Sequence, residues 1–591
     1  MTRGRFGAGL AALAAALCGL AGPPAAAACH VQQIAELAVT MSGQSPMVTA
    51  KINGHDARFI ADSGAFYSLI SPGSAAEFGL KTTPLDFMRL KGMGGETQAY
   101  VTTVKTFTLA ETPISNVQFL VGGSETGGVG LIGQNILGLA DAEYDLAGGA
   151  IRLMKPIDCE KRNLAYWAGP KPISVMSIEA PDTVSHHTVG PVYVNGVKMR
   201  AMFDTGASGS VLSLTAAARL GIKPGGPGVE PDGWSMGLGR RPVRTWAAHV
   251  DTFRAGDEEI RSTRLQIGDL GLEEFDMLVG ADFFLSHRVW VANSQRRMFF
   301  TYSGGPVFNL SGPTKVQEAK DQAPRDSPTT GRDVDPTDAD GFSRRGAAFA
   351  ARRDMEHALA DLDQACKLSP GEARYFFQRA SLRLENHQPL LAMADLDQVL
   401  KLQPDHAEAL LMRAELRVFG GDKAGARSDL DAAASAAATA SDLRLRIASI
   451  YSSAEAFEAA LPLFDQWIRF HPDDARMGDA LNGRCWARAV LNRELDKALA
   501  DCNAALKRLP ASAALLDSRG LVHLRQGDLD RAIADYDAAL AIRPQSAWSL
   551  FGRGLARQRK GLKADGDADI AAALKLRPKV ADEAKRYGVT P

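Results

Sequence analysis

The sequence predicts a multidomain protein of β + α type, in which two tandem all-β domains are followed by an all-α superhelix. Two observations predict this architecture. The N-terminal part carries one aspartate-centred β pattern twice, and the C-terminal part repeats with a period of 34 residues. A chain of 591 residues is also too long for one hydrophobic core. We expect a signal peptide at 1–28, β domains at 29–160 and 161–303, a flexible linker at 304–336 and the helical domain at 337–591.

The first 28 residues have the pattern of an export signal. Arg3 and Arg5 give a positive start, and the apolar stretch from Gly7 to Ala21 is too short to span a bilayer comfortably. Three alanines at 26–28 offer the cleavage site, and no later segment reaches membrane-spanning length, so we expect no transmembrane segment in the mature chain. The Ala-, Gly- and Arg-rich composition favours a periplasmic destination. Secretion, or a lipid anchor on Cys29, are the alternatives.

The charges of the chain nearly balance, with 67 Lys and Arg residues against 68 Asp and Glu residues. A nucleic-acid binder would carry a basic excess or a basic stripe, so we expect no nucleic-acid partner. The sequence has no Gly-Lys-Ser phosphate loop and no Gly-x-Ser-x-Gly turn. His186 and His187 lack Cys or acidic neighbours at ligand spacing, so we expect neither a metal nor another cofactor.

Residues 40–302 have the pattern of β-structure, with short alternating runs between Asn-Gly and Gly-rich turns. Four elements occur twice there in the same order. An Asn-Gly turn begins nine residues before an aspartate, and a glycine-rich segment and an apolar pair closing on glycine follow. The first copy consists of Asn53-Gly54, Asp62-Ser63-Gly64-Ala65, Gly92-Met93-Gly94-Gly95 and Leu131-Ile132-Gly133. The second consists of Asn195-Gly196, Asp204-Thr205-Gly206-Ala207, Gly237-Leu238-Gly239 and Leu278-Val279-Gly280.

This arrangement resembles the retropepsin-like aspartic peptidases. The resemblance implies acid-protease domains, a polypeptide substrate and a catalytic pair formed by Asp62 and Asp204. It also implies that the hydroxyls of Ser63 and Thr205 brace the two loops, and that Gly64 and Gly206 let the backbone approach the carboxylates. Two flap hairpins would close over the substrate and exclude water. The flap glycines are Gly92, Gly94, Gly95, Gly237 and Gly239.

Two carboxylates in one site suit peptide hydrolysis. Like charges a few ångströms apart cannot both ionise, so the pair retains one proton. The ionised carboxylate activates a water as general base, and the protonated one hydrogen-bonds the scissile carbonyl. Because the pair titrates as a unit, neither aspartate has a fixed role.

Both copies lie in one chain, which favours a dyad within the chain over pairing of like copies from two chains. The first copy departs from the family by continuing with Phe66-Tyr67-Ser68, where the second has Ser208-Gly209-Ser210. Phe66 could pack in the core, or it could obstruct the cleft and leave the first copy as a structural partner.

The C-terminal part keeps prolines in register over repeated units, at Pro370, Pro404, Pro472, Pro510, Pro544 and Pro578. Small residues follow the same register: Gly346, Ala380, Ala414, Ala448, Gly520 and Gly554. Each unit holds two stretches of helical apolar spacing, and this pattern resembles the tetratricopeptide repeat (TPR). We expect seven units over 337–578, a C-terminal cap, and a protein partner on the concave surface.

The cysteines suggest two disulfides. Cys29 and Cys159 bracket the first β region, and an oxidising compartment would favour a bridge between them. Cys485 and Cys502 fall on the two helices of the fifth unit, where a bridge and two buried thiols are equally good interpretations. Cys366 would stay unpaired.

The sequence therefore predicts an exported aspartic endopeptidase whose repeats recruit protein substrates or partners. One alternative is a non-catalytic peptide-binding or scaffold protein of the cell envelope. A third interpretation assigns the function to the repeats and treats the β domains as a spacer.

Overall fold

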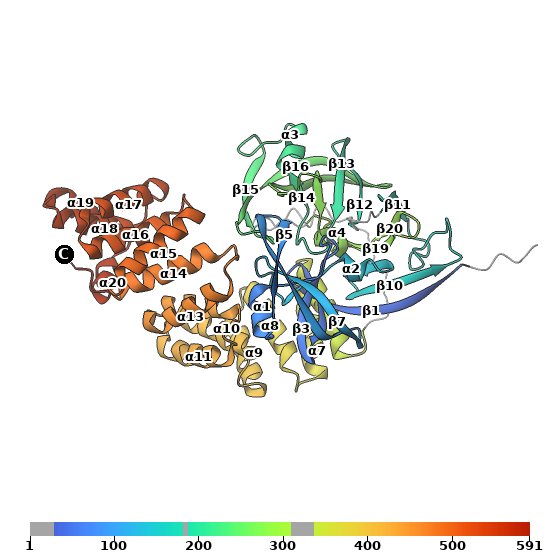
Figure 1. Ribbon diagram of the computed structural model, residues 1–591, viewed down its shortest axis with the longest axis horizontal. Helices are drawn as coiled ribbons and strands as arrows, with labels where there is room; N and C mark the ends of the chain where they lie inside the picture. Colours follow the sequence, from blue (N-terminus) through green and yellow to red (C-terminus); the bar gives the residue numbers. More distant parts are fainter. Residues whose placement is uncertain (1–28, 181–186, 309–335, 591) are drawn as a thin grey trace, which may run out of the picture.

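The computed structural model describes residues 29–180, 187–308 and 336–590. The predicted signal peptide, residues 181–186 and most of the predicted linker lie outside the described residues. Two β domains lie beside a long array of helices, whose first members pass along the β domains and whose last members extend away from them (Figure 1). None of the helices in the described ranges combines the length and the apolar character that a membrane span requires.

The first β domain is built around a sheet whose strands follow the order β2-β3-β8-β4-β7-β6-β5. The β2–β3 hairpin turns at Asn53-Gly54, where Asn53 adopts a left-handed φ of 51°. Two short helices, α1 (Pro72–Glu77) and α2 (Gln134–Leu137), follow β4 and β8. The strands are β2 (Ser45–Ile52), β3 (His55–Ala61), β4 (Leu69–Ile70), β5 (Thr83–Gly92), β6 (Gly95–Leu109), β7 (Thr112–Val121) and β8 (Gly130–Ile132).

The second β domain repeats this topology strand for strand, in the order β12-β13-β18-β14-β17-β16-β15. The additional pairing of β2 with β6 is matched by a pairing of β12 with β16. The strands are β12 (Val189–Val194), β13 (Val197–Phe203), β14 (Val211–Ser213), β15 (Val229–Ser235), β16 (Val243–Ala255), β17 (Glu258–Gly268) and β18 (Met277–Val279). The short helices α3 (Leu214–Arg219) and α4 (Ala281–Ser286) take the places of α1 and α2. The sequence duplication is therefore a duplication of the fold.

A shared sheet joins the two β domains, with strand order β11-β20-β19-β9-β10-β1. At its centre β9 of the first copy pairs antiparallel with β19 of the second, and Tyr144 lies opposite Val289. Both copies therefore meet within one chain. The strands are β1 (His30–Ser42), β9 (Asp141–Asp145), β10 (Ala150–Ile157), β11 (Ser174–Ser177), β19 (His287–Ala292) and β20 (Arg297–Tyr302).

Seven helix pairs follow in residues 336–590, with α20 (Val580–Arg586) after the last pair. Small residues allow the paired helices to approach closely: a methyl group added at Gly520 would lie 3.0 Å from the ring of Tyr536. The pairs are α6 (Ala339–Ala351) with α7 (Met355–Leu368), α8 (Ala373–Glu385) with α9 (Pro389–Leu402), α10 (Ala407–Phe419) with α11 (Lys423–Ala436), α12 (Leu443–Ser453) with α13 (Phe457–Phe470), α14 (Met477–Val490) with α15 (Leu495–Arg508), α16 (Ala513–Gln526) with α17 (Leu529–Ile542), and α18 (Ala547–Arg559) with α19 (Lys563–Leu576).

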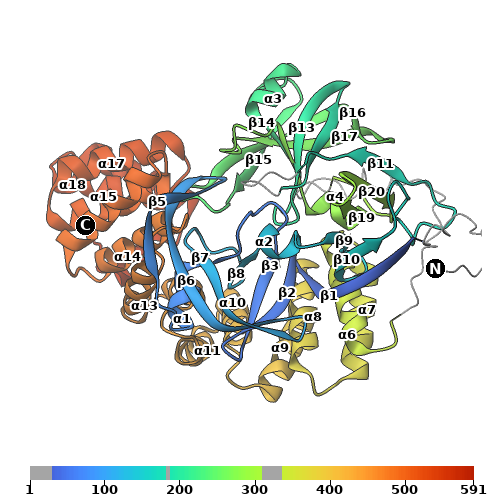
Figure 2. The same ribbon diagram turned by 45° about the vertical axis from the view of Figure 1, so that its right-hand side comes forward.

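The helices are attached to the β domains at their first pair. Helix α6 packs against β1 (Figure 2), and Ala348 and Ala351 of α6 are buried in the same core as Leu37 and Val39 of β1. Burial of apolar surface at this contact stabilises the two parts together.

Both suggested disulfides are present. Cys29 is joined to Cys159, which ties the start of β1 to the segment after β10, and Cys485 is joined to Cys502 across α14 and α15. Among the cysteines of the described ranges, Cys366 remains a buried free thiol.

Candidate active site

The two aspartates of the duplicated motif follow directly on equivalent strands. Asp62 follows β3 and Asp204 follows β13, and the backbone N–H of each donates to a carbonyl of the apolar pair: Asp62 to Ile132 at 2.9 Å, and Asp204 to Val279 at 2.8 Å. Because β3 and β13 pair in parallel with β8 and β18, the apolar-apolar-Gly elements fix the start of each loop.

Four hydrogen bonds cross between the two loops. The Oγ1 of Thr205 accepts from the N–H of Ser63 at 3.0 Å, and the Oγ of Ser63 accepts from the N–H of Thr205 at 2.9 Å. Each hydroxyl also donates across the interface, Ser63 to the carbonyl of Phe203 at 3.0 Å and Thr205 to the carbonyl of Ala61 at 2.7 Å. Both side chains are buried, so these bonds are protected from competing water. The pair braces the two loops reciprocally.

The glycines after the aspartates bring the two carboxyl groups together. A methyl group added at Gly64 would lie 2.2 Å from Cγ of Asp204, and one added at Gly206 would lie 2.3 Å from Cγ of Asp62. Their N–H groups also donate to the preceding aspartate, Gly64 to Asp62 Oδ1 at 2.9 Å and Gly206 to Asp204 Oδ1 at 2.8 Å. A side chain at either position would separate the carboxyl groups.

The electrostatics of the pair follow from this proximity. Burial, the charge of Asp204 and a hydrogen bond with Asp204 together hold the pKa of Asp62 well above its usual range, against the lowering effect of the N–H groups of Ala65 and Gly64. Beneath the pair, burial and then the charge of Asp62 also raise the pKa of Tyr144. The site therefore favours one retained proton on the carboxyl pair.

A second layer of polar residues, which the sequence reasoning missed, holds each loop. In the first copy Oδ1 of Asn135 accepts from the N–H and the hydroxyl of Ser68, each at 2.8 Å. In the second copy Asp282 accepts from the N–H and the hydroxyl of Ser210 at 2.9 and 2.7 Å. Burial raises the pKa of Asp282 to about 6, although the hydrogen bonds from Ser210 lower it. A polar residue two positions after each apolar-apolar-Gly element was the available signal.

The predicted flap glycines lie in two loops that contact each other. The β5–β6 hairpin turns at Met93-Gly94, between Gly92 and Gly95, and the segment from β15 to β16 carries Gly237 and Gly239. The N–H of Gly239 donates to the carbonyl of Met93 at 2.9 Å, and that of Arg241 donates to the carbonyl of Gly94 at 3.2 Å. The two flap tips are therefore hydrogen-bonded to each other.

The flaps also contact the helical domain, through Ser124. Its Oγ donates to the carbonyl of Gly239 at 2.7 Å and accepts from the N–H of Ala475 at 3.0 Å. Beside it the N–H of Glu125 donates to Asp474 Oδ2 at 2.9 Å, and Arg240 pairs with Asp473 at 2.6 Å. A buried His471–Glu125 pair, 3.3 Å apart, completes the contact.

The helical side of this contact is the segment 471–476 between α13 and α14. It has six residues, as does 437–442, whereas the corresponding connections 369–372, 403–406, 509–512 and 543–546 have four. One of the two longer connections between helix pairs is therefore the segment that meets the flap. A methyl group at Gly73 of α1 would lie 2.2 Å from Nε2 of His471, so the two parts are in tight contact.

Phe66 does not join the core. Its side chain is half-buried and packs edge-on against Tyr67, with ring centroids 4.3 Å apart, and Tyr67 itself is exposed. The backbone carbonyl of Phe66 accepts from the N–H of Asn135 at 3.0 Å. The aromatic pair lies on the loop that carries Asp62.

Comparisons with known proteins agree with the two parts of the chain. The family model described as aspartyl protease matches residues 48–136 and 190–283, and the model described as TPR repeat matches residues 520–561. A search of curated proteins gave no match.

Solved structures similar to this chain include TPR proteins. YrrB, described as a TPR protein with an unusual peptide-binding site, is 20% identical with a TM-score of 0.28, and the match covers 32% of this chain and 95% of YrrB. A TPR protein from Parabacteroides merdae is 15% identical with a TM-score of 0.33, covering 42% of this chain and 98% of its own. The pilus biogenesis factor PilW is 16% identical with a TM-score of 0.30, covering 36% and 96%. The chain thus carries two tandem aspartyl protease domains followed by TPR repeats.

Proposed function

We propose that the protein is an exported aspartic endopeptidase, acting in the periplasm, that hydrolyses peptide bonds with Asp62 and Asp204. The reciprocal brace between Ser63 and Thr205 is the observation that carries the proposal. It holds two equivalent aspartate loops together, with each glycine against the opposite carboxyl group. Such precise convergence of two carboxyl groups has a direct chemical use in general acid–base catalysis.

The chemistry needs a water between the two carboxyl groups and the scissile peptide. The ionised carboxylate takes a proton from the water as its oxygen attacks the carbonyl carbon, and the protonated carboxyl donates a hydrogen bond to the carbonyl oxygen. Collapse of the tetrahedral intermediate transfers a proton to the leaving amine and breaks the C–N bond. The raised pKa of Asp62 supports a proton resident on the pair over a range above the ordinary aspartate value.

Substrate access requires the flaps to open. Their tips are bonded to each other and, through Ser124, to the TPR segment 471–476. We propose that the TPR domain recruits polypeptide substrates or protein partners, as stacked helical repeats commonly do.

The test is cleavage of an unbiased peptide mixture by purified residues 29–591, scanned from about pH 4 to 7 to bracket a shared-proton pair. We expect the wild type to cut and both Asp62→Asn and Asp204→Asn to lose at least about 10³-fold in rate, because either change removes the acid–base pair. Asp56→Asn, at the exposed start of β3, is the matched control and should keep full activity.

The same peptides should be assayed for binding by fluorescence anisotropy. The aromatic pair on the Asp62 loop, half-buried Phe66 and exposed Tyr67, favours one alternative, a peptide-binding or scaffold protein without hydrolysis. If the wild type and both dyad variants bind the peptides and none of them cleaves, the protein is a non-hydrolysing peptide-binding protein and the endopeptidase proposal is wrong.

A further inference from the structure

The TPR helices carry a ladder of ion pairs that recurs from unit to unit. In the second unit Nε and Nη2 of Arg379 lie 3.0 and 2.6 Å from the two carboxylate oxygens of Asp395. A second arginine one helical turn on, Arg383, donates from Nη1 to Oδ2 of Asp395 at 2.7 Å. Asp395 therefore binds two guanidinium groups.

A cluster of this kind, two arginines on one aspartate, is called a rung below. The same rung recurs in three further units of the described chain. In each, the first arginine makes two hydrogen bonds to the aspartate and the second makes one. The second-arginine Nη1 to aspartate Oδ2 distances are 2.7, 2.5 and 2.8 Å. The rungs are Arg413 and Arg417 with Asp429, Arg484 and Arg488 with Asp501, and Arg553 and Arg557 with Asp569.

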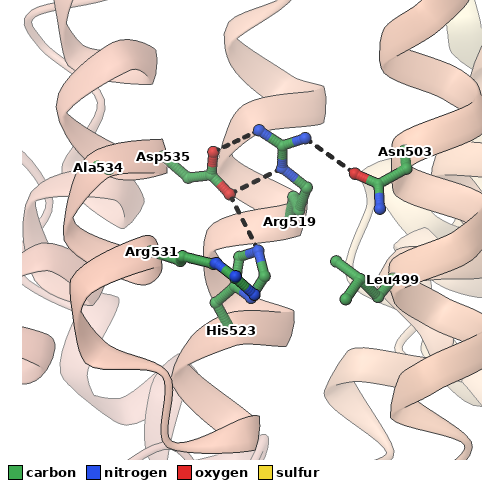
Figure 3. A pocket seen from close by; sticks show the side chains of 7 residues that line it. All are labelled: Leu499, Asn503, Arg519, His523, Arg531, Ala534 and Asp535. Atoms are coloured by element: carbon green, nitrogen blue, oxygen red, sulfur yellow. Dashed lines mark hydrogen bonds and ion pairs between the residues drawn. The ribbon is translucent and has the colours of Figure 1, made fainter.

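The sixth unit keeps the first arginine of the rung and lacks the second. Arg519 binds Asp535 at 2.9 and 2.7 Å, but His523 stands where the other units have their second arginine (Figure 3). Its Nε2 lies 3.8 Å from Asp535 Oδ2, beyond hydrogen-bonding distance. Its Nδ1 is buried and makes no hydrogen bond within the described part of the chain.

A hollow of about 410 Å³ opens at this place, between α15, α16 and α17. His523, Asp535 and Arg519 line it together with Leu499, Asn503 and Ala534. The shorter imidazole does not fill the space that a second arginine fills elsewhere in the ladder. In the first unit, which also has one arginine on its aspartate, the half-buried Phe349 takes this position.

The sixth unit lacks the second guanidinium that the equivalent aspartates of four other units bind. Asp535 is buried, and it binds one guanidinium where four equivalent aspartates bind two. Burial lowers the pKa of His523, so its imidazole is neutral at pH 7 and does not replace the missing cation. Hydrogen bonds from charged donors to a carboxylate are shorter and about twice as strong as neutral ones.

The basic residues around the hollow already have acidic or polar partners. Nη1 of Arg519 donates to Oδ1 of Asn503 at 2.9 Å, and Arg531, which also lines the hollow, pairs with Asp528 at 3.3 Å. An anionic ligand would therefore compete with bonds that are already made, and the carboxylate of Asp535 would repel it. A guanidinium on Oδ2 of Asp535 would displace none of these bonds.

We propose that this hollow is a binding site for an arginine side chain of a partner polypeptide. The incoming guanidinium would donate to Oδ2 of Asp535, as the second arginine of the other rungs does. Four other units of the same chain show this binding geometry, because a second arginine donates to Oδ2 of the equivalent aspartate in each of them. Lysine would bind less well, since an ammonium lacks the planar fork that matches a carboxylate. The site is independent of the aspartate pair and of peptide hydrolysis.

The test uses the full chain and saturation-transfer NMR with Nα-acetyl-arginine amide as the probe. We expect binding with a dissociation constant on the order of millimolar, as for one small ligand with a single anchoring group. The matched ligand is Nα-acetyl-citrulline amide, which has the same shape without the charge, and it should bind at least about tenfold more weakly. Inorganic phosphate should not displace the arginine probe.

Two histidine–arginine exchanges test the position. His523→Arg should fill the hollow from within, complete the rung and abolish binding of the probe. Arg557→His should open an equivalent hollow at Asp569 and add a second site in the seventh unit. An arginine probe that binds His523→Arg as well as the wild type, equal binding of the citrulline probe, or displacement by phosphate would each overturn the proposal. Absence of binding to the wild type would do the same.

Discussion

Thr205 and Ser63 each bury a hydroxyl whose hydrogen bonds cross between the two copies. Thr205→Val keeps the shape of the side chain and removes the oxygen, which leaves the N–H of Ser63 and the carbonyl of Ala61 buried without partners. Each lost partner costs about 1–3 kcal/mol, so we expect the free energy of unfolding of the β domains to fall by about 2–6 kcal/mol. Denaturant unfolding monitored by tryptophan fluorescence measures this loss.

The control at this position is Thr205→Ser, which copies the first loop. Because the serine hydroxyl can make the same two bonds, we expect it to cost less than about 1 kcal/mol. Equal losses for valine and serine would show that the methyl group, rather than the brace, stabilises the interface.

At the scale of the secondary elements, the equivalent loops are held by an amide in one copy and by a carboxyl group in the other. Burial raises the pKa of Asp282 from 3.8 to about 6, so the folded protein holds this proton more tightly than the unfolded chain does. The protonated Asp282 carboxyl group contributes its full stabilisation to the folded state below pH 4, and this contribution is lost as the pH rises toward 6. About two pKa units correspond to about 3 kcal/mol.

Asp282→Asn copies the first loop, where Asn135 accepts both bonds from Ser68. We expect this variant to gain stability relative to the wild type between pH 4 and pH 7, by up to about 3 kcal/mol, because an amide does not ionise. Melting temperatures of both proteins across that range measure the effect. The reverse change, Asn135→Asp, should introduce the same loss in the first copy. Parallel pH profiles for wild type and Asp282→Asn would contradict the assignment.

At the scale of the whole molecule, the TPR domain stabilises the flap contact. Asp474→Ala removes the acceptor for the N–H of Glu125 and a partner of Arg476, and so loosens the segment that holds Ser124. We expect faster amide hydrogen exchange at residues 93–95 and 236–242, by about tenfold for a loss of about 1.4 kcal/mol. Hydrogen-exchange mass spectrometry of the full chain measures this.

The control for the flap is Asp530→Ala, on α17, which removes a surface partner of Lys560 away from segment 471–476. Its flap exchange should match that of the wild type. If Asp474→Ala also leaves the exchange unchanged, the flap tips are held by their own hydrogen bonds alone.

Much of this architecture could be predicted because its signals are local or repeated. Asp-Ser-Gly and Asp-Thr-Gly, the paired Asn-Gly turns and the 34-residue register each mark an element by its own residues. The fold class and the family resemblance needed nothing else, and the family models agree with both.

What could not be predicted depends on pairings between distant segments. The contact of Ser124 with Ala475 spans 351 residues, and neither a serine nor an alanine indicates from its type which distant residue it will contact. Asn135 and Asp282 were visible as polar residues after the apolar-apolar-Gly elements, but their role depends on the serines that the fold places against them. His523 could be recognised as an exception only once the other rungs of the ladder were known.

The order of the domains along the chain also sets when the two aspartates can come together during synthesis. Asp62 is translated early, but its brace waits for Thr205, and the shared sheet waits for β19 and β20 at residues 287–302. The core around β1 then takes up α6, and the base of the flap meets residues 471–476 later still. A nascent chain therefore carries Asp62 without its partner over the 142 residues that separate it from Asp204. The two loops and the shared sheet are complete once residue 302 has been made, about halfway along the 591 residues, whereas the contact with the helical segment 471–476 must wait for the later part of the chain.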